Sequence, residues 1–135
     1  MKFRKILPYV FVFISSFIIT PFAITSFVKY AHIKAQEYTE DFNPATSKLH
    51  DGIYEGHFRF FLITFSKVEF EIETGKVKSI DFKKMFHSPG SLYKKDIEFQ
   101  IKRRKLLEVD AITGATRTSN FAKAAIKDAT ENNPF

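Results

Sequence analysis

Residues 110–120 read DAITGATRTSN and gather four side-chain hydroxyls around one glycine, directly before a segment with helical periodicity. These hydroxyls belong to Thr113, Thr116, Thr118 and Ser119. The first turn of a helix has unpaired backbone N–H groups and a partial positive charge, so it can accept a hydroxyl cap or hold an anion. A hydroxyl placed there can bind a phosphate, and it can also be esterified by one.

Spacing alone leaves two interpretations of this turn open. In the first, the hydroxyls only cap a helix that begins near Ser119, and Gly114–Ala115 makes a tight turn into it. In the second, the small side chains of Gly114–Ala115 let a phosphate or a ring approach the backbone. A threonine hydroxyl is a poor nucleophile without a base, and no residue next to Thr118 in the sequence is an obvious one.

Alternating patterns upstream predict the sheet that must support this turn. Residues 67–73 alternate charged and apolar side chains, Thr74–Gly75 fits a tight hairpin turn, and residues 76–82 begin a return strand. Residues 52–65 are aromatic and β-branched enough for one or two further strands, with a bulge expected at Gly56. We therefore expect a small antiparallel sheet.

Two helices are expected after the sheet. Residues 92–105 alternate like a strand at Ile97, Phe99 and Ile101, but the flanking charges and the lack of breakers favour a helix. The last segment has a clear apolar helical face, formed by Phe121, Ala122, Ala125, Ile126 and Ala129. A sheet with separate helices predicts the α+β class, with the helices packed on the sheet.

The N-terminal region predicts a membrane anchor. Residues 6–28 contain no charged side chain, and a helix of that length spans a hydrocarbon core of roughly 30 Å. Pro8 and Pro21 are tolerated in such helices. A cleaved signal peptide is the alternative, but the apolar run is long for one and no A-x-A cleavage pattern follows it.

The predicted organisation has four parts. Residues 1–5 form a cytoplasmic tail, residues 6–28 the transmembrane anchor, residues 29–50 a helical stem and linker, and residues 51–135 the folded domain. Basic residues are concentrated before the anchor, which places the folded domain on the extracytoplasmic side of the cell membrane as a single-pass protein.

Composition excludes several functions. The chain has no cysteine, so it cannot use thiol chemistry, and its charge of +6 is not one-sided enough to suggest nucleic-acid binding. We expect no metal site, because the histidines lack close pairing, and no catalytic residues, because no acid–base pair or triad is visible. The basic run at residues 102–105 is either a solvated face or a docking site for an acidic partner or anionic lipid.

The hydroxyl-rich segment resembles the attachment motif of the FMN-binding domain family, which includes the flavin-carrying subunits of sodium-pumping quinone reductase and of related ferredoxin-oxidising complexes. In that motif an aspartate is followed by Ser/Thr-Gly-Ala-Ser/Thr and then by the modified threonine, often with a serine after it. The matching residues are Asp110, Thr113, Gly114, Ala115, Thr116, Thr118 and Ser119. The resemblance implies that Thr118 carries FMN through a phosphoester bond.

Two further stretches extend the resemblance to residues 51–130. DGIYEG at residues 51–56 is similar to the opening of many family members, and a hairpin with a glycine turn follows in both. HSPG at residues 87–90 is similar to a Thr-Pro-Gly loop, which makes Ser88, Pro89 and Gly90 candidate flavin contacts. An acidic residue commonly precedes that loop in the family, whereas this chain has His87.

The resemblance implies a membrane-anchored flavoprotein that transfers electrons to or from a membrane redox partner, rather than an independent enzyme. It also implies that a separate magnesium-dependent flavin transferase moves FMN from FAD to the threonine. Covalent attachment suits an exported domain, because a loosely held flavin would be lost by dilution. The alternative function is an anchored binding or assembly domain without flavin, in which the hydroxyls only cap the helix.

Overall fold

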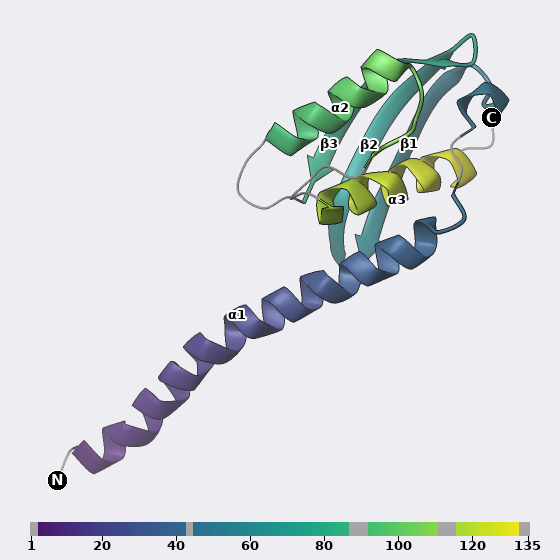
Figure 1. Ribbon diagram of the computed structural model, residues 1–135. Helices are drawn as coiled ribbons and strands as arrows, with labels where there is room; N and C mark the ends of the chain where they lie inside the picture. The colour runs from purple at the N-terminus through teal and green to yellow at the C-terminus, as the bar shows by residue number, and fades with distance from the viewer. Residues whose placement is uncertain (1–2, 43–44, 87–91, 111–115, 133–135) are drawn as a thin grey trace. The chain divides into compact units, whose positions relative to one another are not determined.

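The computed structural model describes residues 3–42, 45–86, 92–110 and 116–132 (Figure 1). The chain divides into two compact units, Met1–Ile33 and Lys34–Phe135, and helix α1 (Phe3–Thr39) runs from the first into the second. The remaining elements are the short 3-10 helix η1 (Thr46–Lys48), strands β1 (Gly52–Phe60), β2 (Ile63–Glu73) and β3 (Lys76–Met85), and helices α2 (Leu92–Arg104) and α3 (Thr116–Asn132).

Helix α1 presents apolar side chains outward over most of its described length in the first unit, although Val28 and Ala31 are buried. Four phenylalanine rings between residues 11 and 22 are 71–78 % exposed. The helix is long and apolar enough to cross a membrane over Pro8–Thr39, and both prolines lie inside it. Its polar side chains bond within the helix, since the Thr20 hydroxyl donates to the Ser16 carbonyl at 2.6 Å. These features fit the predicted anchor.

The second unit is a two-layer α+β fold, as predicted. Its three strands form an antiparallel sheet in the order β1-β2-β3. Helix α3 packs on β1 and β2, and helix α2 packs on β3, so both helices lie against one face of the sheet (Figure 1). The inward residues of β2, Val68, Phe70 and Ile72, are at most 1 % exposed, which confirms the alternation read from the sequence.

Turn chemistry sets the register between β2 and β3. Thr74 and Gly75 have φ angles of 53° and 70°, and two positive values are what a type I′ hairpin turn requires. This part of the sequence prediction is confirmed. The predicted bulge at Gly56 is wrong: the irregularity in β1–β2 pairing lies after Phe58, where Phe65 of β2 is the extra residue.

Helix α2 resolves the ambiguous segment in favour of a helix, as expected. Ile97 and Ile101 are four residues apart and fully buried, whereas Phe99 between them is 64 % exposed. A strand would have put all three side chains on one face, so their different burial reflects helical rather than strand periodicity. Lys105, directly after the last residue of the helix, has a φ of 57°, a left-handed conformation typical of helix C-termini.

Helix α3 lies very close to β1, and Gly56 makes this approach possible. A Cβ atom at Gly56 would lie 2.6 Å from the Cα of Ala129, and it would also overlap the Ala129 nitrogen and the Ala125 carbonyl oxygen. The facing residues of α3 are small: Ala122, Ala125 and Ala129 are fully buried. Gly56 is therefore needed for helix packing, not for a bulge.

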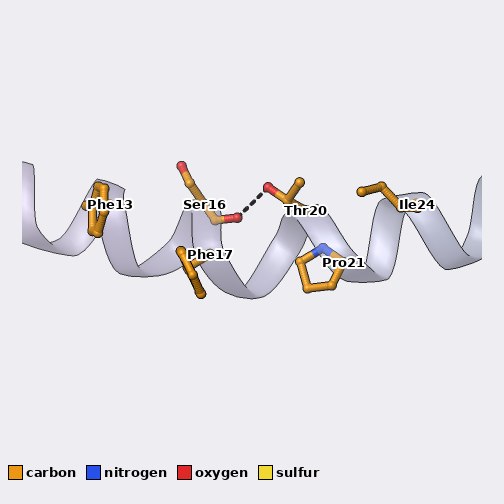
Figure 2. A pocket seen from close by; sticks show the side chains of 6 residues that line it. All are labelled: Phe13, Ser16, Phe17, Thr20, Pro21 and Ile24. Carbon is orange, nitrogen blue, oxygen red and sulfur yellow. Dashed lines mark hydrogen bonds between the residues drawn. The ribbon is translucent and has the colours of Figure 1, made fainter. Parts of the chain in front are cut away.

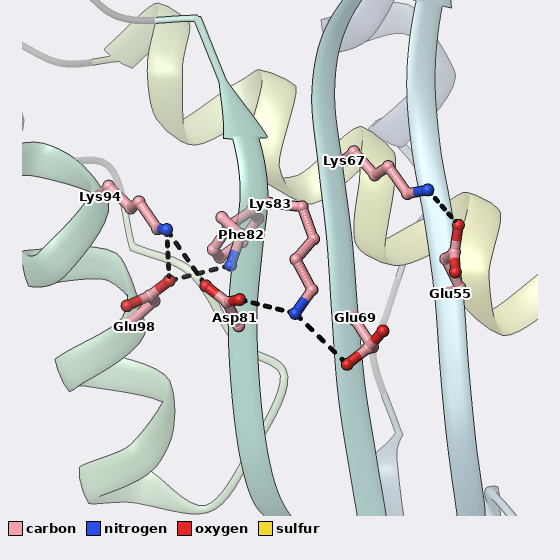
Figure 3. A network of polar contacts seen from close by, with 8 residues as sticks. All are labelled: Glu55, Lys67, Glu69, Asp81, Phe82, Lys83, Lys94 and Glu98. Carbon is pink, nitrogen blue, oxygen red and sulfur yellow. Dashed lines mark hydrogen bonds and ion pairs between the residues drawn. The ribbon is translucent and has the colours of Figure 1, made fainter.

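Acidic side chains from the two helices bind backbone groups of the two edge strands. Glu98 of α2 accepts a hydrogen bond from the Phe82 nitrogen of β3 at 2.8 Å, and Asp128 of α3 accepts one from the His57 nitrogen of β1, also at 2.8 Å. Figure 3 shows Glu98 within a network that continues through Lys94 to Asp81. These contacts cover edge N–H groups that another chain would otherwise pair with.

We predict that Gly56→Ala destabilises the folded unit. The added methyl group must displace the backbone of α3, and overpacking of this kind costs about 1–3 kcal/mol in free energy of unfolding. Urea unfolding of the full chain in detergent, followed by circular dichroism, measures the effect. Ile53→Ala is the control on the same strand, because Ile53 is 72 % exposed; it should lower stability by less than about 1 kcal/mol. Equal losses in the two variants would contradict the packing role of Gly56.

Candidate functional site

Thr118 lies in the first turn of α3, as its third residue. The helix begins at Thr116 and not near Ser119 as predicted from the sequence. Ser119 is fully buried and belongs to the packed face of the helix. The Thr118 side chain is also covered, at 4 % exposure, whereas Thr116 and Arg117 are exposed. Among the described hydroxyl residues of this segment, Thr116 is therefore exposed, whereas Thr118 and Ser119 are buried.

The start of α3 has the polarity that a phosphate needs. Its first turn contains no acidic side chain, and Arg117 supplies a positive charge. Helical side chains tilt toward the N-terminus, so a group attached to Thr118 is directed to the positive end of the helix dipole. A phosphoester with one negative charge fits this electrostatic environment.

Asp110 is held by a contact that the sequence did not predict. Its carboxylate accepts a hydrogen bond from Arg104 at 2.6 Å, between the C-terminal end of α2 and the segment that leads to α3. The Arg104 guanidinium lowers the pKa of the Asp110 carboxyl below its usual value, first through this hydrogen bond and then through its charge. Residues 102–105 are all exposed. One member of this basic run, Arg104, binds Asp110 and so has a structural role as well.

An aromatic cluster lies one helical turn after Thr118. The Phe121 ring has its centroid 4.8 Å from that of Phe65, 5.8 Å from that of Phe58 and 6.1 Å from that of Phe86. Three of these rings are buried, as expected for core packing, but Phe86 is 41 % exposed. Sequence reasoning missed Phe86, although its position directly before the HSPG stretch was a usable signal.

One buried hydroxyl beside this cluster has an unused hydrogen-bonding capacity. Ser66 is fully buried, and its Oγ has no partner within the part of the chain that the structure describes. It follows Phe65 in β2 and pairs with Phe58 on one side and Met85 on the other. A buried polar atom without a partner costs about 1–3 kcal/mol, so a ligand with a polar edge would gain by reaching it.

Several predicted site residues cannot be placed. Thr113, Gly114 and Ala115 of the motif lie outside the described residues, as do Ser88, Pro89 and Gly90 of the second stretch and His87 before them. Among the residues that are described, no group of three or more histidine, aspartate or glutamate side chains is suited to hold a metal ion.

A groove of about 390 Å³ lies elsewhere, on the surface of α1. Figure 2 shows the side chains that line it, which are Phe13, Ser16, Phe17, Thr20, Pro21 and Ile24. All belong to the helix that is apolar enough to span a membrane, and none belongs to the motif. The groove is therefore not part of the candidate site.

We predict that Arg104→Gln raises the pKa of Asp110 toward its ordinary value. The present pKa is lowered, so the ion pair stabilises the fold above the carboxyl's unfolded-state pKa, and this stabilisation is lost as the pH falls through the folded-state pKa. An NMR titration of the carboxyl carbon measures the shift. Arg103→Gln, a change at the exposed neighbour, should leave it unaltered. The same Asp110 pKa in wild type and Arg104→Gln would exclude the contact in solution.

Comparison with known proteins identifies the family. A family model described as FMN-binding domain matches residues 64–131, half of the chain. The match begins in β2 and reaches the last turn of α3, so it includes the segment from Asp110 to Ser119, whereas the stretch at residues 51–56 precedes it. No significant match is found among curated proteins or solved structures. From the matched region, which contains the motif, both packed helices and three of the four rings of the aromatic cluster, we conclude that the chain belongs to the FMN-binding domain family.

Proposed function

We propose that this flavin-binding protein is a membrane-anchored electron carrier with FMN joined covalently to Thr118. The observation that carries the proposal is the position of Thr118 in the first turn of α3, within a family match for FMN binding and with the full attachment pattern around it. When bound, the flavin supplies the capacity to accept and donate electrons singly or in pairs.

The residues of this chain would hold the group in three ways. Thr118 provides the ester oxygen, while Arg117 and the first-turn N–H groups of α3 stabilise the phosphate charge. Phe86 offers a partly exposed ring for stacking at the edge of the aromatic cluster, and Ser66 offers a hydroxyl in apolar surroundings.

Attachment requires a partner enzyme and a local opening. The Thr118 oxygen forms a bond to the FMN phosphorus of FAD, the bond between the two FAD phosphates breaks, AMP leaves, and a base of the flavin transferase takes the hydroxyl proton. Because Thr118 is 4 % exposed, the groups that cover it must move before the transferase can reach Oγ1. The first turn of a helix is where such opening costs least.

The burial of Thr118 also favours a second candidate function. If Thr118 and the fully buried Ser119 serve only to cap and pack α3, the protein is an anchored binding or assembly domain without covalent flavin. The two proposals differ in one measurable property, the presence of a covalent flavin on this residue.

We predict that Thr118→Ala abolishes covalent flavin. The wild-type chain, co-expressed with a flavin transferase, should be yellow after denaturation and heavier by one FMN group in its intact mass. Thr118→Ala should lack both signals yet fold, because only a small buried side chain changes. Thr130→Ala, at the other end of the same helix, is the control and should remain labelled. Equal labelling of Thr118→Ala would remove the site assignment, and no label on wild type would favour the binding-domain function.

We predict that the folded domain faces away from the cytoplasm. The chain has no cysteine, so Lys95→Cys and Lys5→Cys each create a single reactive thiol, and Lys95 is exposed on α2. In cells whose cytoplasmic membrane is intact and whose outer membrane, if there is one, has been removed, an impermeant maleimide should label Lys95→Cys. It should label Lys5→Cys only after lysis. The reverse pattern would place the domain inside the cell. Intact mass of the same samples shows whether the anchor is retained or removed as a signal peptide.

A further inference from the structure

The connection between β1 and β2 exposes an apolar surface, which we name the β1–β2 tip (Phe60–Ile63). Phe61 is 74 % exposed, Leu62 97 % and Ile63 48 %. Nearby, Phe86 at the end of β3 is 41 % exposed, and its backbone nitrogen donates to the Phe65 carbonyl at 2.7 Å. Three consecutive large apolar side chains at the end of a hairpin form a contiguous patch of the kind that marks an interaction surface.

The backbone conformation of this turn is a second sign that the apolar residues of the tip have a function. Phe61 has a φ of 52°, a left-handed conformation that is unfavourable for a bulky side chain. The other hairpin of the same sheet uses glycine, Gly75, at one of its two left-handed positions. The β1–β2 tip keeps Phe61 where asparagine would be less strained, and it keeps Leu62 where a polar residue would reduce the exposed apolar area.

Charge around the tip narrows the possible partners. Residues 57–67 contain no aspartate or glutamate, and the exposed side chains flanking the tip include Arg59 on β1 and Lys84 on β3. An apolar end bordered by basic side chains matches the boundary between acyl chains and phosphate headgroups.

The chain also keeps this surface near a bilayer. The folded unit begins at Lys34, within the helix that is apolar enough to span a membrane, so no long linker separates the two units. A connection this short holds the folded domain at a high effective concentration beside the membrane. Even a surface with weak affinity for lipid would then stay in contact with the bilayer.

We infer that the β1–β2 tip inserts into the headgroup region of the membrane in which α1 is anchored. Insertion is shallow, because the backbone groups of a two-residue turn need water or headgroups as hydrogen-bond partners. The inference rests on the anchor of the proposed function but not on the flavin. Phe58 and Phe65 lie beside the tip and contact Phe121 of α3. Insertion therefore brings this end of the sheet, and with it the helix that carries Thr118, toward the membrane surface.

Single tryptophan substitutions test this inference, because the natural chain contains no tryptophan. Leu62→Trp puts the probe in the tip, and Lys76→Trp puts it at an exposed position beside the opposite hairpin. The full chain is reconstituted in phosphatidylcholine vesicles, with and without anionic phosphatidylglycerol and with lipids brominated near the headgroup. Flotation of the vesicles measures anchoring separately, and circular dichroism confirms that both variants fold.

We expect brominated lipid to quench the fluorescence of Leu62→Trp by about twofold, since an interfacial side chain lies about 5–10 Å into the headgroup–acyl boundary. The fluorescence of Lys76→Trp should stay unquenched by lipid and accessible to aqueous iodide, and anionic lipid should increase the difference. Equal iodide access in the two variants in floated vesicles would overturn the inference. Blue-shifted emission from Leu62→Trp that lipid does not quench would also overturn it, since protein would then cover the tip. Failure to float would instead count against the anchor.

Discussion

The close contact between Gly56 and helix α3 determines much of the folded unit. Backbone packs directly on backbone there, which is possible only because β1 has no side chain at that position and α3 presents alanines. Such a contact fixes both the height and the rotation of a helix, because neither partner has a flexible side chain that can adjust. The rotation decides that Thr118, Ser119 and Phe121 all face inward. The candidate site is therefore a consequence of this packing.

Local chemistry explains which parts of the fold were predictable from the sequence. The turn at Thr74–Gly75, the alternation in β2 and the apolar face of α3 depend on neighbouring residues, and each was predicted correctly. The role of Gly56 was not, because its partner Ala129 is distant in sequence. The start of α3 was placed three residues too late, since several hydroxyl residues suit a cap and only tertiary packing selects among them.

The same distinction applies to the candidate site. Its motif is continuous in the sequence, so Asp110 and Thr118 could be proposed from their resemblance to the attachment pattern of the family. The groups around them come from separate elements: Arg104 from the end of α2, and Phe58, Phe65 and Phe86 from three strands or strand ends. No periodicity links such residues, and only the fold brings them together. The low exposure of Thr118 was equally invisible, because a hydroxyl in a turn is expected to be solvated.

Helix α3 makes three contacts along its length, and because one helix makes them all, their positions depend on one another. Its first turn carries Thr118, its middle packs on Gly56, and its last turns hold the end of α1, where the Lys127 ammonium donates to the Tyr38 carbonyl at 2.7 Å and lies 4.4 Å from the centre of the Tyr38 ring. A cation at the C-terminal end of α1 is also favoured by the helix dipole. Because one rigid helix makes all three contacts, the segment that joins the folded unit to the apolar helix and the residue proposed to carry flavin are mechanically connected. The electron transfer proposed for this chain would require this property, since transfer depends on how the cofactor is held relative to its partner.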